Sequence, residues 1–290
     1  MKDGDRNTKF FNECASQRKR KNEISRLWNQ YGEWVSDKTE MEGMGNNYFN
    51  NLFTSSNPAG IPNVVSLVDR VVLDDMNQRL VRDFDAEEVR RALFQIHPTK
   101  APGPDRMSAI FFQNFWHIVG EDFTIAILDY LNTGRMLSSV NLTHIVMIPN
   151  TKSPENLTQF RPISLCNVIY KTISKVLANR LKSILPSIIS KSQSAFVLGR
   201  LILDNILVAF ETLHYMKNKR KGKSTHMAAK LDMSKAYDRV EWGYLEAMMV
   251  RMGFHERWVS LIMNCLSSVH YAVLFNGCPT EAFFPSRGIR

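Results

Sequence analysis

Residues 168–185 constrain the fold more than any other stretch, because their apolar side chains recur with the period of an α-helix. The residues that share one face are Ile169, Ile173, Val176, Leu177, Leu181 and Ile184. A face of that kind is stable only when it packs against another element. Lys171, Lys175 and Lys182 fall on the opposite face, which we interpret as solvated. The segment is therefore expected to be an amphipathic helix of a multilayered fold.

Helix-like and strand-like patterns alternate along the rest of the chain. Helices are expected at residues 6–30, in a later segment that ends near Phe53, and at residues 86–96, 108–131, 201–216, 242–252 and 256–267. The helix at 86–96 opens with Asp85 and Glu88, which resemble a capping box. Strands are expected at residues 143–149, 227–232, 270–275 and 281–284, the last two joined by the hairpin signal Asn276-Gly277. The chain reads as α/β (α+β), with helices outnumbering strands.

The composition of the chain indicates which kinds of partner and which cellular compartment suit it. Lys and Arg total 37 against 28 Asp and Glu, a net charge of +9 that suits a polyanion such as nucleic acid but equally a basic protein without one. The sequence has no apolar run of the roughly 18 residues that span a bilayer, and its charged start lacks a secretory signal. Its four cysteines lack metal-binding spacing. We expect a cytoplasmic or nuclear protein, not secreted, without a membrane partner.

The sharpest local signal is Asp232, in KLDMSKAYD at residues 230–238. An apolar strand would deliver this carboxylate at its end, where it could hold Mg²⁺ beside a substrate phosphate. Two such ions stabilise the attacking and leaving oxygens of phosphoryl transfer. The alternative is that Asp232 or Asp238 caps the helix nearby. The residues alone leave both interpretations open for Asp232 and favour the cap for Asp238.

Six blocks in one order extend this signal. Residues 231–242 (LDMSKAYDRVEW) resemble the first catalytic motif of reverse transcriptases from LINE-type (non-LTR) retrotransposons. Residues 3–11 (DGDRNTKFF) resemble the segment after the endonuclease in such polyproteins, especially those of flowering plants. Residues 98–105 (PTKAPGPD) resemble the family's extra N-terminal motif. Three further segments are similar to later blocks of the family: FRPISLCN at 160–167, QSAFVLGR at 193–200 and PSRGIR at 285–290.

The resemblance implies a role for each of several residues. Asp232 would bind both metal ions, with the carbonyl of Met233 helping one of them. Tyr237 would lie under the incoming sugar and exclude a 2′-hydroxyl, although a core aromatic is the alternative. Arg161, with Lys152, would contact the triphosphate, and Ser234 would also lie at the nucleotide. The expected nucleic-acid contacts are Lys100, Gly103, Gln193, Ser194, Arg200, Arg287 and Gly288.

The resemblance also implies partners and an architecture. The partners are an RNA template, a DNA primer and deoxynucleoside triphosphates, with Mg²⁺ as cofactor. The expected fold has right-hand polymerase fingers and an incomplete ferredoxin-like palm. A helical N-terminal extension occupies residues 1–60, the N-terminal reverse-transcriptase extension 61–142, and the fingers and partial palm 143–290.

The sequence departs from the family pattern in three ways. The family continues with a hairpin that carries an Asp-Asp pair, whereas the only adjacent pair here, Asp74-Asp75, lies upstream and is interpreted as a cap or surface turn. We therefore expect a chain truncated before the second catalytic carboxylates and inactive alone. The alternatives are a non-catalytic module for RNA or hybrid duplex, or a retroelement relic. Arg106 replaces a usual glycine, and Leu198 a usual proline; an arginine at a positive φ would strain its turn.

Overall fold

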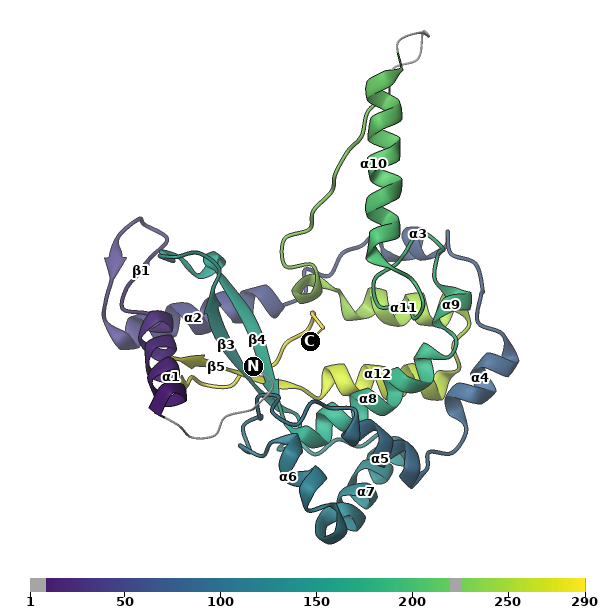
Figure 1. Ribbon diagram of the computed structural model, residues 1–290, viewed down its shortest axis with the longest axis horizontal. Coiled ribbons are helices and arrows are strands. Elements are labelled where there is room, and N and C mark those ends of the chain that lie inside the picture. The colour runs from purple at the N-terminus through teal and green to yellow at the C-terminus, as the bar shows by residue number, and fades with distance from the viewer. Residues whose placement is uncertain (1–8, 220–225, 290) are drawn as a thin grey trace.

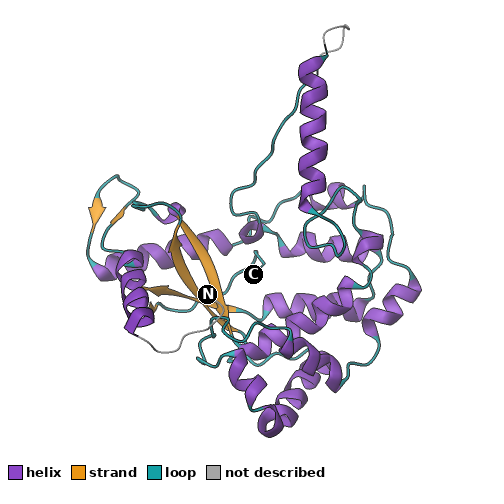
Figure 2. Cartoon of the chain, in the orientation of Figure 1, coloured by secondary structure: helices purple, strands orange, loops and turns teal. Residues whose placement is uncertain are grey.

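The computed structural model describes residues 9–219 and 226–289, which form a sheet layer, a cluster of helices and one projecting helix (Figure 1). Helices outnumber strands, as Figure 2 shows, so the expected α/β class is confirmed. Residues 1–8, 220–225 and 290 lie outside the described residues, and with them most of the block at 3–11 and the last residue of the block at 285–290.

The main sheet has four strands in the order β4-β3-β5-β6. Their bounds are β3 Leu142–Pro149, β4 Phe160–Cys166, β5 His270–Phe275 and β6 Cys278–Pro279. Strand β3 pairs antiparallel with β4 and parallel with β5. Because β4 is an edge strand, it can accommodate Pro162, which has no N–H to donate to a ladder.

One face of this sheet packs on an N-terminal segment. Helix α2 (Lys38–Phe53) begins at Asp37, whose carboxylate accepts from the Glu40 N–H at 2.9 Å. The short hairpin β1 (Leu27–Trp28) and β2 (Trp34–Val35) and helix α1 (Lys9–Asn22) lie beside it (Figure 1). The shared core contains Leu27, Phe49, Phe53, Ile145, Met147, Phe160, Tyr271, Val273 and Phe275.

The second core lies among helices. Their bounds are α4 Asp74–Val81, α5 Ala86–Phe94, α6 Ala109–Asn114, α7 Trp116–Thr133, α8 Val168–Lys182, α9 Leu185–Ile188, α11 Trp242–Met252 and α12 Glu256–Ser267. Helix α3 (Ile61–Val65) packs on α11 outside this core. Two single turns, η1 Leu157–Gln159 and η2 Tyr237–Arg239, complete the list. The apolar face expected of α8 is buried here against α4, α5, α7 and α12, with Ile173, Val176 and Leu177 in its centre.

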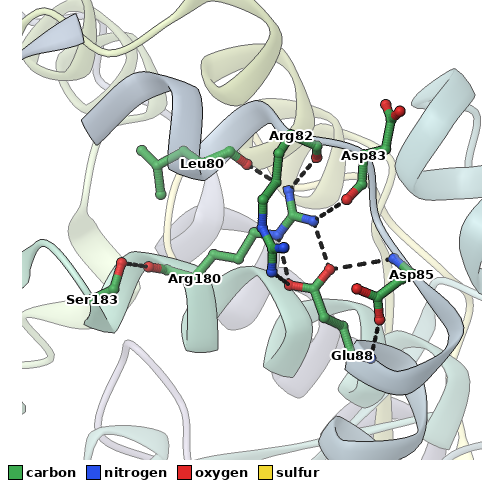
Figure 3. A network of polar contacts seen from close by, with 7 residues as sticks. All are labelled: Leu80, Arg82, Asp83, Asp85, Glu88, Arg180 and Ser183. Carbon is green, nitrogen blue, oxygen red and sulfur yellow. Dashed lines mark hydrogen bonds and ion pairs between the residues drawn. The ribbon is translucent and has the colours of Figure 1, made fainter. Parts of the chain in front are cut away.

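Arg180 of α8 joins this core to the loop between α4 and α5 (Figure 3). Its side chain is only 4% exposed and forms an ion pair with Glu88 at 2.6 Å. The same guanidinium donates to the carbonyl oxygens of Leu80, Arg82 and Asp83. All of its charge is thus matched by acceptors from one neighbouring segment, which fixes α8 against α4 and α5.

Several expected elements are confirmed within a residue or two. The capping box of Asp85 and Glu88 is present, and α11, α12 and β5 have the expected bounds. The pair Asp74-Asp75 opens α4, as a cap or turn should. Lys171 differs from the expected solvated face, because its ammonium donates to the Ala101 carbonyl at 2.6 Å.

Four expectations were wrong in part. The helix expected at 6–30 stops at Asn22, because Ile24 and Leu27 are drawn into the sheet core. The helix expected at 108–131 is split at Phe115 into α6 and α7. Residues 281–284 contribute one bridge, from Phe283 to Tyr271, instead of a strand. Residues 227–232 form no strand, since no described segment pairs with their backbone and an unpaired strand is not stable.

Helix α10 (Ile202–Asn218) projects from the body, and none of its residues is buried (Figure 1). Its exposed apolar residues include Ile202, Leu203, Ile206, Leu207, Val208, Phe210 and Leu213. In the described part of the chain, no helix combines the length and apolarity needed to cross a membrane.

Candidate functional site

A cavity of about 920 Å³ lies between edge strand β4 and the turn at residues 234–238. Its wall contains Arg161 from β4, together with Ser234 and Tyr237 from the turn. These three residues come from blocks some 70 positions apart in the sequence, and each was expected at a bound nucleotide. The other lining residues are Phe53, Asn150, Thr158, Phe160, Pro162, Ile163, Ser164, Phe196, Lys235, Ala236, Asp238, Tyr271 and Ile289.

Strand β4 presents Arg161 on the face opposite to that of buried Phe160, because successive side chains of a strand point to opposite faces. Arg161 is exposed and lies opposite Ile148 of β3 in the antiparallel ladder. The free edge of β4 borders the cavity, and Pro162 breaks the row of donors along it. A guanidinium at such an edge has its full fork of donors available to a phosphate or carboxylate.

The turn that carries Ser234 and Tyr237 is held from beneath by Lys235. The Lys235 ammonium donates to the Tyr48 hydroxyl at 2.8 Å and lies 4.8 Å from the centre of that ring. Lys235 also adopts a left-handed φ of 51°. This conformation places the side chain toward α2, which leaves Tyr237 exposed on the cavity side.

The segment at residues 286–289 closes the turn from the other side. Ile289 donates its N–H to the Tyr237 carbonyl at 2.9 Å, and Gly288 donates to the Val240 carbonyl at 2.7 Å. Gly288 has a φ of 90°, and a Cβ there would lie 2.8 Å from the Phe53 ring. Only glycine therefore fits at this position. Gly288 and Arg287 act here as braces of the turn.

Glu241 holds Arg287 in place beside this turn. Its carboxylate accepts from the Ser55 hydroxyl at 2.5 Å, from Ser56, and from the Arg287 guanidinium at 3.3 Å. Arg287 also donates to the Leu52 carbonyl at 2.9 Å. Burial alone would raise the pKa of Glu241, but these hydrogen bonds outweigh burial and hold the pKa below its usual range.

Two cavity residues have strained backbones. Phe196 has a φ of 64° and Lys235 a φ of 51°, values that are rare for residues with a Cβ. The Phe196 side chain is 81% exposed, so no core packing explains its conformation. Strain of this kind gathers at binding and catalytic sites. Neither strained residue was among the expected site residues.

Asp232 and Met233 lie just before the turn and do not line the cavity. Both are exposed, in the segment of residues 226–233, which has no regular secondary structure. Asp238 is the acidic residue in the cavity wall; burial raises its pKa, against the opposing effect of Lys235 and Arg239. Within residues 9–219 and 226–289 there is no group of three His, Cys, Asp or Glu side chains that could share a metal ion.

The remaining expected site residues lie elsewhere. Lys152 lines a separate hollow of about 240 Å³. Lys100 is exposed, whereas Gly103 is buried, and a Cβ there would lie 2.4 Å from the Asn167 N atom. Close packing on the chain itself therefore requires this glycine. Arg200 donates to the carbonyl oxygens of Pro186, Ile189, Ser190 and Gln193, which closes the loop that contains buried Ser194.

Sequence reasoning missed several members of the cavity. Lys235 and Asp238 belong to the motif that contains Tyr237, so their position was visible, but their roles were not. Phe196 and Ser164 lie inside two of the similar blocks without any chemistry that marks them. Ile289 enters through backbone contacts, for which a side-chain pattern gives no signal.

Parts of known proteins are similar to this chain in sequence. Residues 148–290 match the family described as reverse transcriptase (RNA-dependent DNA polymerase). The chain is 28% identical, over 99% of its length, to the Transposon TX1 uncharacterized 149 kDa protein of Xenopus laevis. It is 22% identical, over 84% of its length, to the retrovirus-related Pol polyprotein from type-2 retrotransposable element R2DM of Drosophila melanogaster. The chain spans about a fifth of the length of these relatives, 22% in both cases.

Proposed function

We propose that this chain, which carries a reverse transcriptase domain of the LINE-type (non-LTR) retrotransposon family, binds the incoming deoxynucleoside triphosphate of an RNA-directed DNA polymerase in the cavity between β4 and the turn at 234–238. The observation that carries the proposal is the meeting of Arg161, Ser234 and Tyr237 around one hollow. Its volume of about 920 Å³ lies within the range of sites that enclose a small molecule.

Each lining residue has a chemical task in this proposal. Arg161 would pair with phosphate oxygens through two parallel N–H groups. Tyr237 would lie against the sugar, where its ring leaves no room for a 2′-hydroxyl. Its side chain is 59% exposed, while its carbonyl is tied to Ile289, so the ring is presented from a fixed backbone. The template and primer would pass outside the cavity, near the loop that carries Lys100.

Mg²⁺ is the cofactor expected of such an enzyme, and Asp232 with the Met233 carbonyl are its proposed ligands. The described residues alone do not form a complete magnesium site, since no cluster of three acidic, His or Cys side chains is present among them. One carboxylate does not hold two dications a few ångströms apart. The role proposed for the described residues is therefore nucleotide binding.

The substitution Tyr237→Val tests the sugar contact. We expect it to raise the affinity for ATP relative to dATP by about tenfold, because steric exclusion in a pocket contributes ~1–3 kcal/mol of discrimination. Isothermal titration of the purified chain with each nucleotide measures the ratio. Tyr215→Val, an exposed tyrosine on α10, is the matched control and should leave the ratio unchanged.

Substitutions of Arg161 test the phosphate contact by the same titration. Arg161→Ala should abolish measurable binding of dATP, and Arg161→Lys should restore it only in part, because an ammonium lacks the bidentate fork. Equal affinity of all three proteins for dATP would contradict the assignment of the cavity.

A second function, binding of RNA or hybrid duplex without catalysis, is favoured by the net charge of +9. Primer extension separates the two functions. DNA synthesis that is lost in Asp232→Asn would establish catalysis, whereas salt-sensitive binding without extension would establish the module. For either function we propose action in the cytoplasm or nucleus, where thiols stay reduced, because all four cysteines are free.

A further inference from the structure

Three aromatic rings are exposed on the β1–β2 hairpin, far in the sequence from the nucleotide cavity. Trp28 and Trp34 are each 42% exposed, and Tyr31 is 77% exposed. Tryptophan is a costly residue to leave in water, so a group of exposed rings indicates a contact surface. We call the three aromatics, together with Arg26, Lys21 and Lys152, the hairpin surface.

The rings are held in fixed positions. Trp28 and Trp34 meet edge to face, with centroids 5.3 Å apart, and the Arg26 guanidinium carbon lies 4.1 Å from the centre of the Trp34 ring. The turn is closed by Asn29, whose side-chain oxygen accepts from the N–H groups of Tyr31 and Glu33. The surface is therefore preorganised.

Cations lie beside Trp34. A hollow of about 240 Å³ beside Trp34 is lined by Lys21, Arg26 and Lys152, against the acidic residues Glu23 and Glu155. The last turns of α1, which precede the hairpin in the sequence, carry three further exposed cations, Arg18, Lys19 and Arg20. Phe160 lines both this hollow and the nucleotide cavity, so the two hollows adjoin.

We infer that the hairpin surface binds single-stranded RNA. Unpaired bases offer faces that stack on Trp and Tyr, and the phosphates between them match the surrounding Lys and Arg side chains. A duplex offers only its phosphates, because its base faces are already stacked. The further statement that the bound strand is the template on its way to the cavity rests on the proposed function.

Binding of a fluorescein-labelled 12-mer of uridine by the full chain tests this, by anisotropy without Mg²⁺ or nucleotide. Tyr31→Ala, and separately Arg26→Ala with Trp34→Leu, should each weaken binding by about tenfold, because one base–aromatic stack contributes ~1–3 kcal/mol. Lys21→Ala with Lys152→Ala should reduce the slope of log affinity against log salt by about 1.4.

The matched control is Arg90→Ala with Phe94→Leu, which removes an exposed cation–aromatic pair from α5. It should bind the uridine 12-mer like the unsubstituted chain. Unchanged affinity in both aromatic variants would overturn the inference, as would equally sensitive binding of duplex RNA. A preference for a thymidine 12-mer of DNA would overturn the assignment to RNA.

The proposal for the nucleotide site and the proposal for the hairpin surface can be refuted independently of each other. Arg161→Ala should leave binding of the uridine 12-mer unchanged, and Tyr31→Ala should leave dATP binding unchanged. Loss of dATP binding in Tyr31→Ala would show that the two sites are not separate and would also contradict the inference.

Discussion

Several non-glycine residues adopt a left-handed backbone conformation that residues with a Cβ disfavour. Arg106 has a φ of 60°, in a turn where its N–H bonds to the Gly103 carbonyl at 3.0 Å. The sequence comparison with reverse transcriptases had already indicated a position that prefers glycine, and the observed φ confirms it. Phe196 and Lys235 share the conformation but line the cavity, and strained residues cluster at binding sites. Arg106 does not line that cavity.

Relief of the strain at Arg106 should stabilise the protein. We expect Arg106→Gly to raise the free energy of unfolding by about 1 kcal/mol, because a left-handed residue with a Cβ costs ~1–2 kcal/mol and the added freedom of the unfolded glycine offsets part of the gain. Urea denaturation measures the change. Leu201→Gly, at an exposed residue with a φ of −100°, should lower the same free energy. A loss of stability in Arg106→Gly would contradict the argument from strain.

At the scale of elements, Arg180 makes α8, α4 and α5 one unit. Arg180→Met should lower the free energy of unfolding by about 3 kcal/mol, because the half-buried Glu88 carboxylate would keep only its ion pair with Arg82 and three carbonyl groups would lose a donor. Lys182→Met, at the exposed end of the same helix, is the control and should change stability little. The double variant Arg180→Met with Glu88→Met should recover much of the loss, as thermal or chemical denaturation would reveal.

The same pair makes stability depend on pH. Burial alone would raise the pKa of Glu88, but the hydrogen bond and charge of Arg180, with Asp85 and Arg82, lower it below its ordinary value of 4.5. A lowered pKa stabilises the folded state above pH 4.5 and ceases to do so as the pH falls through the folded-state value. The stability advantage over Glu88→Gln should therefore shrink below pH 4.5. An advantage that stays constant from pH 6 to pH 3 would exclude this linkage.

The elements also separate what a sequence can predict from what it cannot. Helices α11 and α12 and strand β3 have strong local patterns, and each forms where expected. Residues 227–232 have an equally good strand pattern but no described partner, and pairing is a property of the whole sheet. Arg161 and Tyr237 could be predicted from their motifs, whereas Phe196 and Ile289 reach the cavity through loop conformation and long-range backbone bonds. Local pattern gives no access to such contacts.

For the whole molecule, the largest anomaly is α10, a helix of 17 residues with no buried side chain. Its apolar residues, and the exposed Met227 and Leu231 that follow, form a surface that water does not favour. A surface of this kind promotes association of the isolated chain.

Charged residues on α10 should suppress that association. Leu203→Lys with Phe210→Lys should lower the weight-average mass at micromolar concentration, measured by sedimentation velocity, because both side chains are more than 60% exposed. The melting temperature should stay nearly unchanged, since exposed substitutions alter stability by less than about 0.5 kcal/mol. Leu137→Lys, in an exposed loop, should leave association as it was. Association that persists in the α10 variant would place the contact elsewhere.

Strand β3 is synthesised long before β5, the strand with which it pairs in parallel. Leu142 lies opposite His270, so about 130 residues separate the two neighbours. A ribosome that adds ~5–20 residues per second needs roughly 6–26 seconds to pass from one strand to the other. During that interval β3 and β4 can pair, but the other edge of β3 has no partner and is open to strands of other chains. Translation speed across this interval, more than the stability of the finished sheet, determines how long that edge is exposed in each new molecule.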